Sequence, residues 1–402
     1  MHTIQYLEYS PDLGSRDKST VVSRLRAAAA CFPFSHLLVG WHVPQPLLEA
    51  CREEADHLGL RFLRWQPLLT TDRGIQVDPS WYTTNLAGNM VQGYRGSPEF
   101  NFLCPNHPGL QEALVKHLDG LLQEGIYQGF FLDRIRFPSP SADPENDLAC
   151  FCEHCCRKAA RESLDLKGIR QAIRQQLGNE QGRISLVKNL LSGSPGPVKA
   201  KQDQALTEFL TFRQRSISDF LALITQSLRA SNLEIGLDCF SPGLAPMVGQ
   251  SLRELSSLVD WVKVMTYGHT FAPAGLPFEL SGFIRYLTHM TPLDERQALD
   301  LVRNSANLPL PEDVHSMETL GLSSSALQQE VVRAVATIGS PVLAGIELAD
   351  LQGVTQLTSP QIQADLAAIK RARPAGLAIS WDLWHIPLDK LELARKAYFE
   401  KQ

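Results

Sequence analysis

Residues 129–156 read GFFLDRIRFPSPSADPENDLACFCEHCC, and this stretch decides how the rest of the chain is interpreted. It begins with an apolar run, 130–132, which ends at Asp133, Arg134 and Arg136. A run without polar alternation is typical of a strand buried on both faces, as in the parallel sheets of α/β proteins. Prolines then interrupt regular structure, and four cysteines follow. Because a buried carboxylate is costly unless it is paired or used, we interpret this segment as one wall of an active site beside a metal-binding cysteine cluster.

Runs of the same kind recur along the chain, and helical patterns separate most of them. The eight predicted strands are residues 4–9, 36–41, 60–69, 129–135, 234–240, 261–267, 342–348 and 377–384. Leucine-rich stripes with helical spacing follow within 110–122, 210–228 and 388–398. This alternation predicts an α/β protein, a (β/α)8 TIM barrel formed by residues 1–402 as a single domain. A doubly wound open sheet has the same local alternation, so the count of eight is what favours the barrel.

Three predicted connections are longer than ordinary strand-to-helix loops. They cover residues 70–103 after the third strand, 139–204 after the fourth and 268–323 after the sixth. All three follow strands, so they are expected to rise from the catalytic face of the barrel. Long loops within compact folds are usually functional or disordered. We interpret 139–204, which carries the cysteines, as an insertion after the fourth strand.

Composition narrows the functional class. The chain has 402 residues, 44% hydrophobic and 20% charged, with a net charge of -5 and both signs spread along its length. This balance argues against nucleic-acid binding. The N-terminal residues lack the basic and apolar regions of a signal peptide, and no apolar run reaches the ~18 residues that a membrane span needs. We therefore expect a cytoplasmic protein without a membrane segment, and its oligomeric state is not predicted.

Acidic residues stand at or just after the ends of four predicted strands. These are Asp133, Asp238, Glu347 and Asp382. Barrel enzymes take their catalytic groups from such positions, and a pair of carboxylates is the minimum equipment for cleaving a glycosidic bond. An acid at a strand end is equally typical of a helix N-cap. Nearby aromatic residues, Trp41 and Trp381 among them, would offer sugar rings a stacking surface, which predicts a carbohydrate substrate.

Two strand motifs resemble known enzymes. The pattern F-L-D-x-I-R-F-P around Asp133 looks like the fourth-strand signature of bacterial glycoside hydrolases with TIM-barrel folds. The run DWVKVMTYGH at 260–269 is similar to a sixth-strand run, D-x-x-x-x-M-x-Y, of several such families. The segment Cys104-Pro105-Asn106, with the later Cys150-x-Cys152-x-x-Cys155, resembles the zinc cluster of family 42 β-galactosidases, in which corresponding segments supply four thiolates.

The resemblance also implies roles for the acids. Family 42 enzymes carry an Asn-Glu pair at the end of strand four, whereas this chain reads Leu132-Asp133-Arg134. Glu347 matches the place where retaining barrel glycosidases carry their nucleophile, which would make Asp133 the acid/base. A rival mapping makes Asp133 the nucleophile and Asp238 or Glu347 the proton donor. We predict Asp133 and Glu347 as the catalytic pair and leave their roles open.

The remaining predicted site residues would bind substrate. If Arg136 points into the barrel mouth it would favour an ionised Asp133, and otherwise it is a structural ion-pair partner. Tyr267 ends the sixth predicted strand, and a role in filling the core is an equal alternative for it. His269 follows this strand, where a structural imidazole is more common than one that binds a sugar hydroxyl. The predicted substrate-binding set is Trp41, Arg136, Asp238, Tyr267, His269, Trp381 and Asp382.

The cysteine spacing predicts a zinc site. Zinc prefers four soft ligands in a tetrahedron, which short C-x-C and C-x-x-C hooks supply. Cys150, Cys152 and Cys155 provide three ligands and Cys104 is the best fourth, with His154 and Cys156 as substitutes. Four thiolates close a site, so the zinc would be structural, and no catalytic cofactor is predicted. A metal-free turn of the same shape is the alternative.

Other functional classes have less support. The sequence contains no dinucleotide fingerprint, P-loop, H-E-x-x-H or G-x-S-x-G motif. The prediction is therefore a glycoside hydrolase acting on a small glycan or glycoside. The alternatives are a catalytically silent barrel that binds carbohydrate or a partner, and a sugar lyase or isomerase that uses the same carboxylates.

Overall fold

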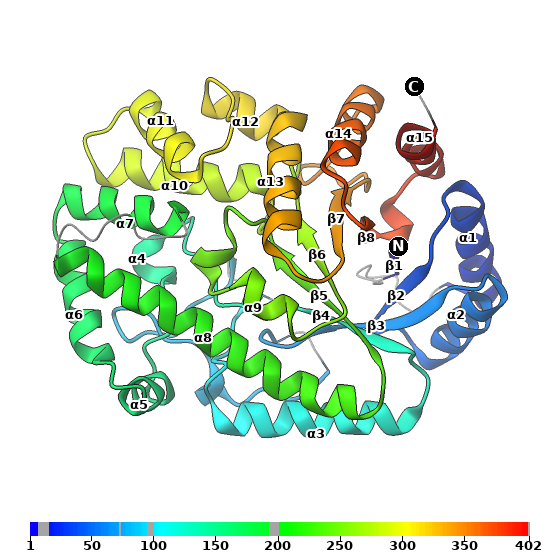
Figure 1. Cartoon of the computed structure of the whole chain (residues 1–402), viewed down its shortest axis with the longest axis horizontal. Helices are drawn as coiled ribbons and strands as arrows, with labels where there is room; N and C mark the ends of the chain where they lie inside the picture. The colour runs from blue at the N-terminus through cyan, green and yellow to red at the C-terminus, as the bar shows by residue number, and fades with distance from the viewer. Residues whose placement is uncertain (7–15, 72–73, 95–99, 193–200, 401–402) are drawn as a thin grey trace.

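Eight parallel strands form a closed barrel in which each strand pairs with the next along the chain and the last pairs with the first (Figure 1). The computed structural model describes residues 1–6, 16–71, 74–94, 100–192 and 201–400. The strands are β1 His2–Tyr6, β2 His36–Gly40, β3 Arg61–Pro67, β4 Gly129–Asp133, β5 Glu234–Phe240, β6 Trp261–Met265, β7 Val342–Glu347 and β8 Gly376–Asp382. The predicted (β/α)8 barrel is confirmed. Most strands end one or two residues earlier than predicted, and residues 7–9 of the first predicted strand lie outside the described part of the chain.

Large side chains fill the interior of the barrel. Successive residues of a strand point to opposite faces, so alternate positions face inward. Leu63, Trp65, Phe131 and Trp261 belong to one buried interior cluster, and the rings of Phe131 and Trp261 stack with centroids 5.3 Å apart. A Cβ atom on Gly236 would lie 2.2 Å from the Trp261 ring, so only glycine leaves room for this indole. The barrel interior beneath the catalytic face is therefore filled with packed side chains.

Helices surround the barrel, and their apolar stripes pack against it. The long helix α8 crosses the front of the view in Figure 1, and α3 lies along its lower edge. The helices are α1 Lys18–Cys31, α2 Gln45–His57, α3 Pro108–Glu124, α4 Pro144–Asp147, α5 Glu153–Arg161, α6 Leu166–Gln176, α7 Glu180–Ser192, α8 Lys201–Ala230, α9 Leu252–Ser256, α10 Leu276–Met290, α11 Glu295–Ala306, α12 Val314–Leu320, α13 Ser324–Thr337, α14 Ser359–Ala372 and α15 Leu388–Phe399. Short 3-10 helices occur at Pro79–Trp81, Ala245–Val248 and Leu383–His385. The three helices predicted from leucine periodicity correspond to α3, α8 and α15.

The connection after β4 builds a helical lobe beside the barrel. Helices α4 to α7 lie at the left of Figure 1, at the end of α8 that is distant from the barrel centre. An isolated antiparallel bridge joins Asn85, in the connection after β3, to Ala149, in the connection after β4. Another bridge, between Tyr82 and Leu103, precedes Cys104. These bridges place two distant cysteine segments beside each other.

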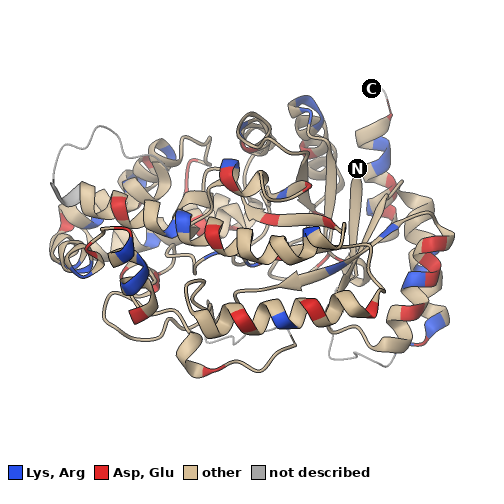
Figure 2. Ribbon diagram, turned by 60° about the horizontal axis from the view of Figure 1, so that its bottom comes forward, with Lys and Arg blue, Asp and Glu red and all other residues tan. Residues whose placement is uncertain are grey.

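Charged residues of both signs are interspersed on the outer helices (Figure 2). This distribution agrees with the small net charge of -5. Within the residues that the structure describes, no helix combines the length and the apolar character that crossing a bilayer requires.

Candidate active site at the barrel mouth

A cavity of about 650 Å³ opens at the carboxyl ends of the strands. This volume falls within the range of about 300–1,000 Å³ that is usual for ligand sites. Seven of the predicted site residues line the cavity, together with residues that the sequence analysis did not select, such as Gln5 and Lys263. The seven are Trp41, Asp133, Arg136, Asp238, Tyr267, Trp381 and Asp382.

Asp133 ends β4 and faces this cavity with a partly exposed carboxylate. The indole Nε1 of Trp65, on the neighbouring strand, donates a hydrogen bond of 2.9 Å to Oδ2. The backbone N–H of Arg134 donates to Oδ1, and Arg134 has a left-handed φ of 55° that turns the chain away from the barrel. Two donors therefore fix the orientation of a carboxylate that a ligand can still reach.

Asp238 on β5 is more deeply buried, with 4% of its surface exposed. Its Oδ2 accepts a hydrogen bond of 2.8 Å from Lys263 Nζ, while its buried Oδ1 has no hydrogen-bond partner among the described residues. Burial raises the pKa of Asp238 to about 7, against the lowering effect of Lys263 and with a further contribution from Asp133. Among the described residues, this buried oxygen is therefore the acceptor of Asp238 that is still without a donor, on a residue that lines the cavity.

Lys263 is the cationic partner of Asp238, and it is not among the residues predicted from the sequence. The two residues are paired in register across β5 and β6, and Lys263 is 1% exposed. Burial opposes its charge, but Asp238 and Tyr267 outweigh this effect and raise its pKa. The signal in the sequence was a single charged residue inside an apolar strand, since buried lysines are rare unless paired.

The wall formed by β6 and β8 carries a chain of polar side chains. Tyr267 OH donates to Ser380 Oγ at 2.8 Å, and Ser380 Oγ donates to Gln5 Oε1 at 2.9 Å. The Tyr267 ring meets the Trp381 ring edge-on, with centroids 6.3 Å apart. Tyr267 thus combines a satisfied hydroxyl with an aromatic face at the cavity.

Arg136 lies in the wall of the cavity and is 5% exposed. Its guanidinium lies 4.4 Å from the ring centroid of Phe102 and 4.5 Å from that of Phe240. Burial lowers its pKa to about 10, although Glu279 and Asp133 act in the opposite direction. Its guanidinium therefore contacts aromatic rings, and it also donates a hydrogen bond of 3.3 Å to Phe137 O.

Trp41 and Asp382 complete the predicted lining. The buried indole Nε1 of Trp41 has no hydrogen-bond partner among the described residues. Asp382 Oδ1 accepts a hydrogen bond of 2.9 Å from the backbone N–H of Trp384 and caps a short 3-10 helix. Asp382 therefore acts as a helix N-cap, which is the alternative role given above for an acid at a strand end.

Glu347 and His269 do not line the cavity. Glu347 is 2% exposed, and its Oε1 accepts a hydrogen bond of 2.6 Å from the backbone N–H of His269. The His269 ring lies between Asp365 Oδ2, 2.9 Å from Nε2, and Leu320 O, 2.8 Å from Nδ1. The structure therefore brings Asp133 and Asp238 to one cavity and places Glu347 in a separate buried cluster with His269 and Asp365.

That cluster has its own electrostatic balance. Burial raises the pKa of Glu347 to about 7, although the neighbouring His269 lowers it. Burial also disfavours a charged His269, but the hydrogen bond to Asp365 and the charge of Glu347 outweigh this and raise its pKa to about 9. The two acceptors, Asp365 Oδ2 and Leu320 O, favour the imidazolium form of His269.

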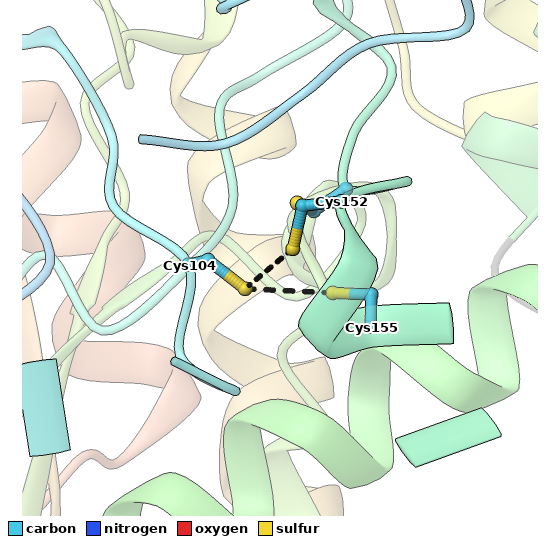
Figure 3. Close-up of side chains that lie close together, drawn as sticks. Cys104, Cys152 and Cys155 are labelled. Atoms are coloured by element: carbon cyan, nitrogen blue, oxygen red, sulfur yellow. Dashed lines mark hydrogen bonds between the residues drawn. The ribbon is translucent and has the colours of Figure 1, made fainter. Parts of the chain in front are cut away.

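The four predicted cysteine ligands converge. The Sγ atoms of Cys104, Cys150, Cys152 and Cys155 lie within 4.8 Å of one another. Cys104 Sγ is 3.4 Å from that of Cys155 and 3.5 Å from that of Cys152, and Figure 3 shows these three side chains pointing toward one another. Zn–S bonds of ~2.3 Å in a tetrahedron give S···S separations of about 3.8 Å. The cluster has the dimensions to hold a metal ion.

Surrounding groups support this arrangement. The backbone N–H of Thr84 donates to Cys150 Sγ at 3.3 Å, and Asn106 Nδ2 donates to Cys155 Sγ at the same distance. Donors of this kind orient metal-bound thiolates. The two substitutes considered earlier have other contacts, since Cys156 Sγ donates to Phe151 O and the His154 ring packs on His107.

Comparisons with known proteins identify the fold. No protein-family description and no curated protein matches the chain. The glycoside hydrolase domain of PgaB (BpsB) from Bordetella bronchiseptica is 11% identical with a TM-score of 0.59, covering 100% of this chain and 99% of that one. The catalytic domain of a β-amylase from Paenibacillus polymyxa is 10% identical with a TM-score of 0.51, covering 100% and 97%.

A β-galactosidase from Rahnella is also similar, with 10% identity and a TM-score of 0.55. The match covers 98% of this chain and 55% of that one. At such identities the likeness concerns the fold and not the residues of the site. The chain thus has a barrel of the kind found in glycoside hydrolases.

Proposed function

We propose that the protein is a glycoside hydrolase whose active site is the cavity at the barrel mouth. The observation that carries this proposal is that Asp133 and Asp238, from neighbouring strands, line one cavity together with aromatic rings. Two carboxylates and a stacking surface are what cleavage of a glycosidic bond requires. Solved structures with similar folds include a glycoside hydrolase domain and a β-amylase, which supports this choice among the chemistries that a TIM barrel can host.

The two acids have environments suited to different roles. Asp133 is held by two N–H donors and remains partly exposed, which suits a group that attacks the anomeric carbon or activates water. Burial raises the pKa of Asp238 to about 7, which favours the protonated form more than in an ordinary aspartate. A general acid works best with a pKa near the working pH, so we assign Asp238 to protonate the leaving oxygen.

This assignment follows the second of the two mappings drawn from the sequence. The pairing of Asp133 with Glu347 stays a prediction. The buried position of Glu347, and its hydrogen bond from His269, are the reasons for preferring Asp238. Trp41, Tyr267 and Trp381 are proposed to contact the sugar, with Arg136 and Asp382 in the wall around it.

We also propose that the cysteine cluster binds zinc. Four thiolates with N–H donors around them match a closed structural site, which would join the connections after β3 and β4. The resemblance to the zinc cluster of family 42 β-galactosidases supports the identity of the metal. Such an ion would have no open coordination position, so it would take no part in the reaction.

The test is a panel of chromogenic glycosides assayed with the natural protein and with Asp133→Asn. We expect hydrolysis of at least one glycoside, and a loss on the order of 10⁴-fold in kcat for the variant with an unchanged circular dichroism spectrum. Asp119→Asn, on the exposed face of α3, is the matched control. Equal activity of Asp133→Asn and the natural protein would refute the assignment. Binding of a sugar without turnover would favour the alternative of a catalytically silent barrel that binds carbohydrate. That alternative is suggested by the Asp-Arg sequence at the position where family 42 enzymes have Asn-Glu.

A further inference from the structure

A second, smaller cavity adjoins the barrel mouth. Its volume is about 330 Å³, at the lower end of the range of about 300–1,000 Å³ for ligand sites. Phe100, Arg136 and Pro273 line both cavities. The smaller one, called here the side cavity, therefore lies next to the larger one, and these three residues form the wall between them.

The walls of the side cavity come from three connections that are distant in sequence. Gln92 and Phe102 belong to the connection after β3, Ser141 and Asp147 to the connection after β4, and Phe278 to the start of α10, after β6. These are the three connections that the sequence analysis singled out for their length. A cavity built where all three meet is a product of the folded connections and not of the barrel itself.

One side of the side cavity is polar and already ordered. Glu279, which is fully buried, accepts hydrogen bonds from Ser139 Oγ at 2.5 Å and from Ser141 Oγ, while its other oxygen accepts from the backbone N–H of Ala274 at 2.8 Å. Its hydrogen-bonding oxygens are thus satisfied within the protein. Glu279 holds the connections after β4 and β6 in place.

Asp147 differs from Glu279 in having no donor. No described residue donates a hydrogen bond to its carboxylate, which lines the side cavity at the end of α4. Burial, together with the charges of Asp143 and Glu279, raises the pKa of Asp147 to about 7. A carboxylate in this position gains from hydroxyl donors on a ligand, which would replace the water that it loses on burial.

The opposite side is aromatic. The rings of Tyr94 and Phe278 meet edge-on with centroids 5.0 Å apart, and both line the side cavity. Phe102 adds a third ring, over which the Arg136 guanidinium is stacked. A pyranose has an apolar C–H face and an edge of hydroxyl groups. The aromatic side of the cavity is complementary to the C–H face, and the hydrogen-bond acceptors on the other side are complementary to the hydroxyls.

We propose that the side cavity binds a second sugar unit of the substrate, so that the natural substrate is a glycan of at least two units that passes Arg136 from one cavity to the other. This inference rests on the proposed function, because it assumes that the first unit occupies the barrel mouth. The hydroxyls of the second unit donate to Asp147, and its C–H face packs on the rings of Tyr94 and Phe278.

The test uses an array of defined glycans of one to six sugar units, probed with the full chain carrying Asp133→Asn to prevent turnover. Ala142→Trp, added to this chain, fills the side cavity from an exposed position, and Asp147→Asn removes one acceptor charge without changing shape. Ala336→Trp, exposed on α13, is the matched control for the added indole. In the parent we expect retention to increase about tenfold from one unit to two or more, the gain that one added favourable contact gives.

Ala142→Trp should remove this gain while leaving the retention of single units unchanged, and Asp147→Asn should reduce it. Ala336→Trp should behave like the parent. If Ala142→Trp shows the same length dependence as the parent, the second subsite is refuted and the proposed function stands. If the parent retains no glycan of any length, the proposed function itself fails, and the inference fails with it.

Discussion

Asp238, near the end of β5, and Glu347, at the end of β7, are two buried carboxylates, but only Asp238 lines the cavity at the barrel mouth. Their exposures are 4% and 2%, and burial raises the pKa of each to about 7. Asp238 lines the cavity and has an oxygen without a partner, whereas Glu347 is enclosed and accepts a hydrogen bond from the backbone of His269. Each has a cation nearby, Lys263 for one and His269 for the other.

This difference teaches that a raised pKa at a strand end does not by itself identify a catalytic acid. Structural networks also perturb pKa values. What separates the two residues is access, since a reacting group must lie within hydrogen-bond reach of the substrate. For identifying a catalytic acid, the position of the carboxyl relative to the cavity is therefore more informative than its pKa.

The largest expected effect compares the two residues directly. Asp238→Asn should lower kcat about 10²- to 10⁴-fold, the usual contribution of a general acid, whereas Glu347→Gln should change it less than about threefold. Steady-state kinetics on the glycoside identified in the panel measures both. If Glu347→Gln is the inactive variant and Asp238→Asn is active, the pairing of Asp133 with Glu347 is restored.

A second prediction concerns the metal content and the stability of the cysteine cluster. Cys104→Ser should abolish stoichiometric zinc and lower the free energy of unfolding by on the order of 4 kcal/mol, as loss of a structural metal ligand does. Metal analysis and denaturant unfolding measure the two quantities. Cys156→Ser, whose sulfur lies outside the four-cysteine set, is the control and should retain the metal. Full stability of a metal-free Cys104→Ser protein would count against a structural zinc.

A third prediction concerns the raised pKa that Glu347 and Asp238 share. The folded pKa of Glu347, about 7, lies above its ordinary value of 4.5, so its contribution to stability is complete below pH 4.5 and is lost as the pH rises to 7. The loss amounts to about 3 kcal/mol. Glu347→Gln should remove this part of the pH dependence of unfolding, and Asp238→Asn should do the same for its own residue. Unfolding curves between pH 4 and 8 that are identical in shape for Glu347→Gln and the natural protein would show that Glu347 is not perturbed.

The smallest predicted effect concerns Lys263 alone. Its ammonium lowers the pKa of Asp238, so Lys263→Met should raise that pKa and move the basic limb of the pH–rate profile upward by roughly one pH unit or more. Activity should fall as the pH rises through this limb, because the acid must be protonated. Lys263→Arg, which keeps the charge, should move the limb less. A limb that does not move in Lys263→Met would exclude Asp238 as the titrating acid.

Much of the site was predictable because it depends on local pattern. Asp133, Asp238 and Asp382 were selected as acids at strand ends, and the barrel brings all three to one cavity. The four cysteines followed from short spacings and one resemblance, and they converge. Lys263 left a local signal that was not used, a lone charge in the apolar strand WVKVM, because the whole strand was assigned to the core.

Glu347 could not be placed from pattern. It occupies the same kind of strand end as Asp238, but the backbone N–H that donates a hydrogen bond to its carboxylate belongs to His269, 78 residues earlier in the chain. The side cavity is a comparable case, since its walls combine residues from the connections after β3, β4 and β6.

The sequence by itself determined the eight strands, the acids at their ends and the cysteine spacing, because periodicity and short-range spacing act within a few residues of chain. Only the tertiary structure decided which acids face the cavity, which cation pairs with Asp238 and where the side cavity forms. Those properties depend on packing between separate segments of the chain, such as Asp238 with Lys263, 25 residues later, and His269 with Glu347, 78 residues later, and such packing leaves no periodic trace in the sequence.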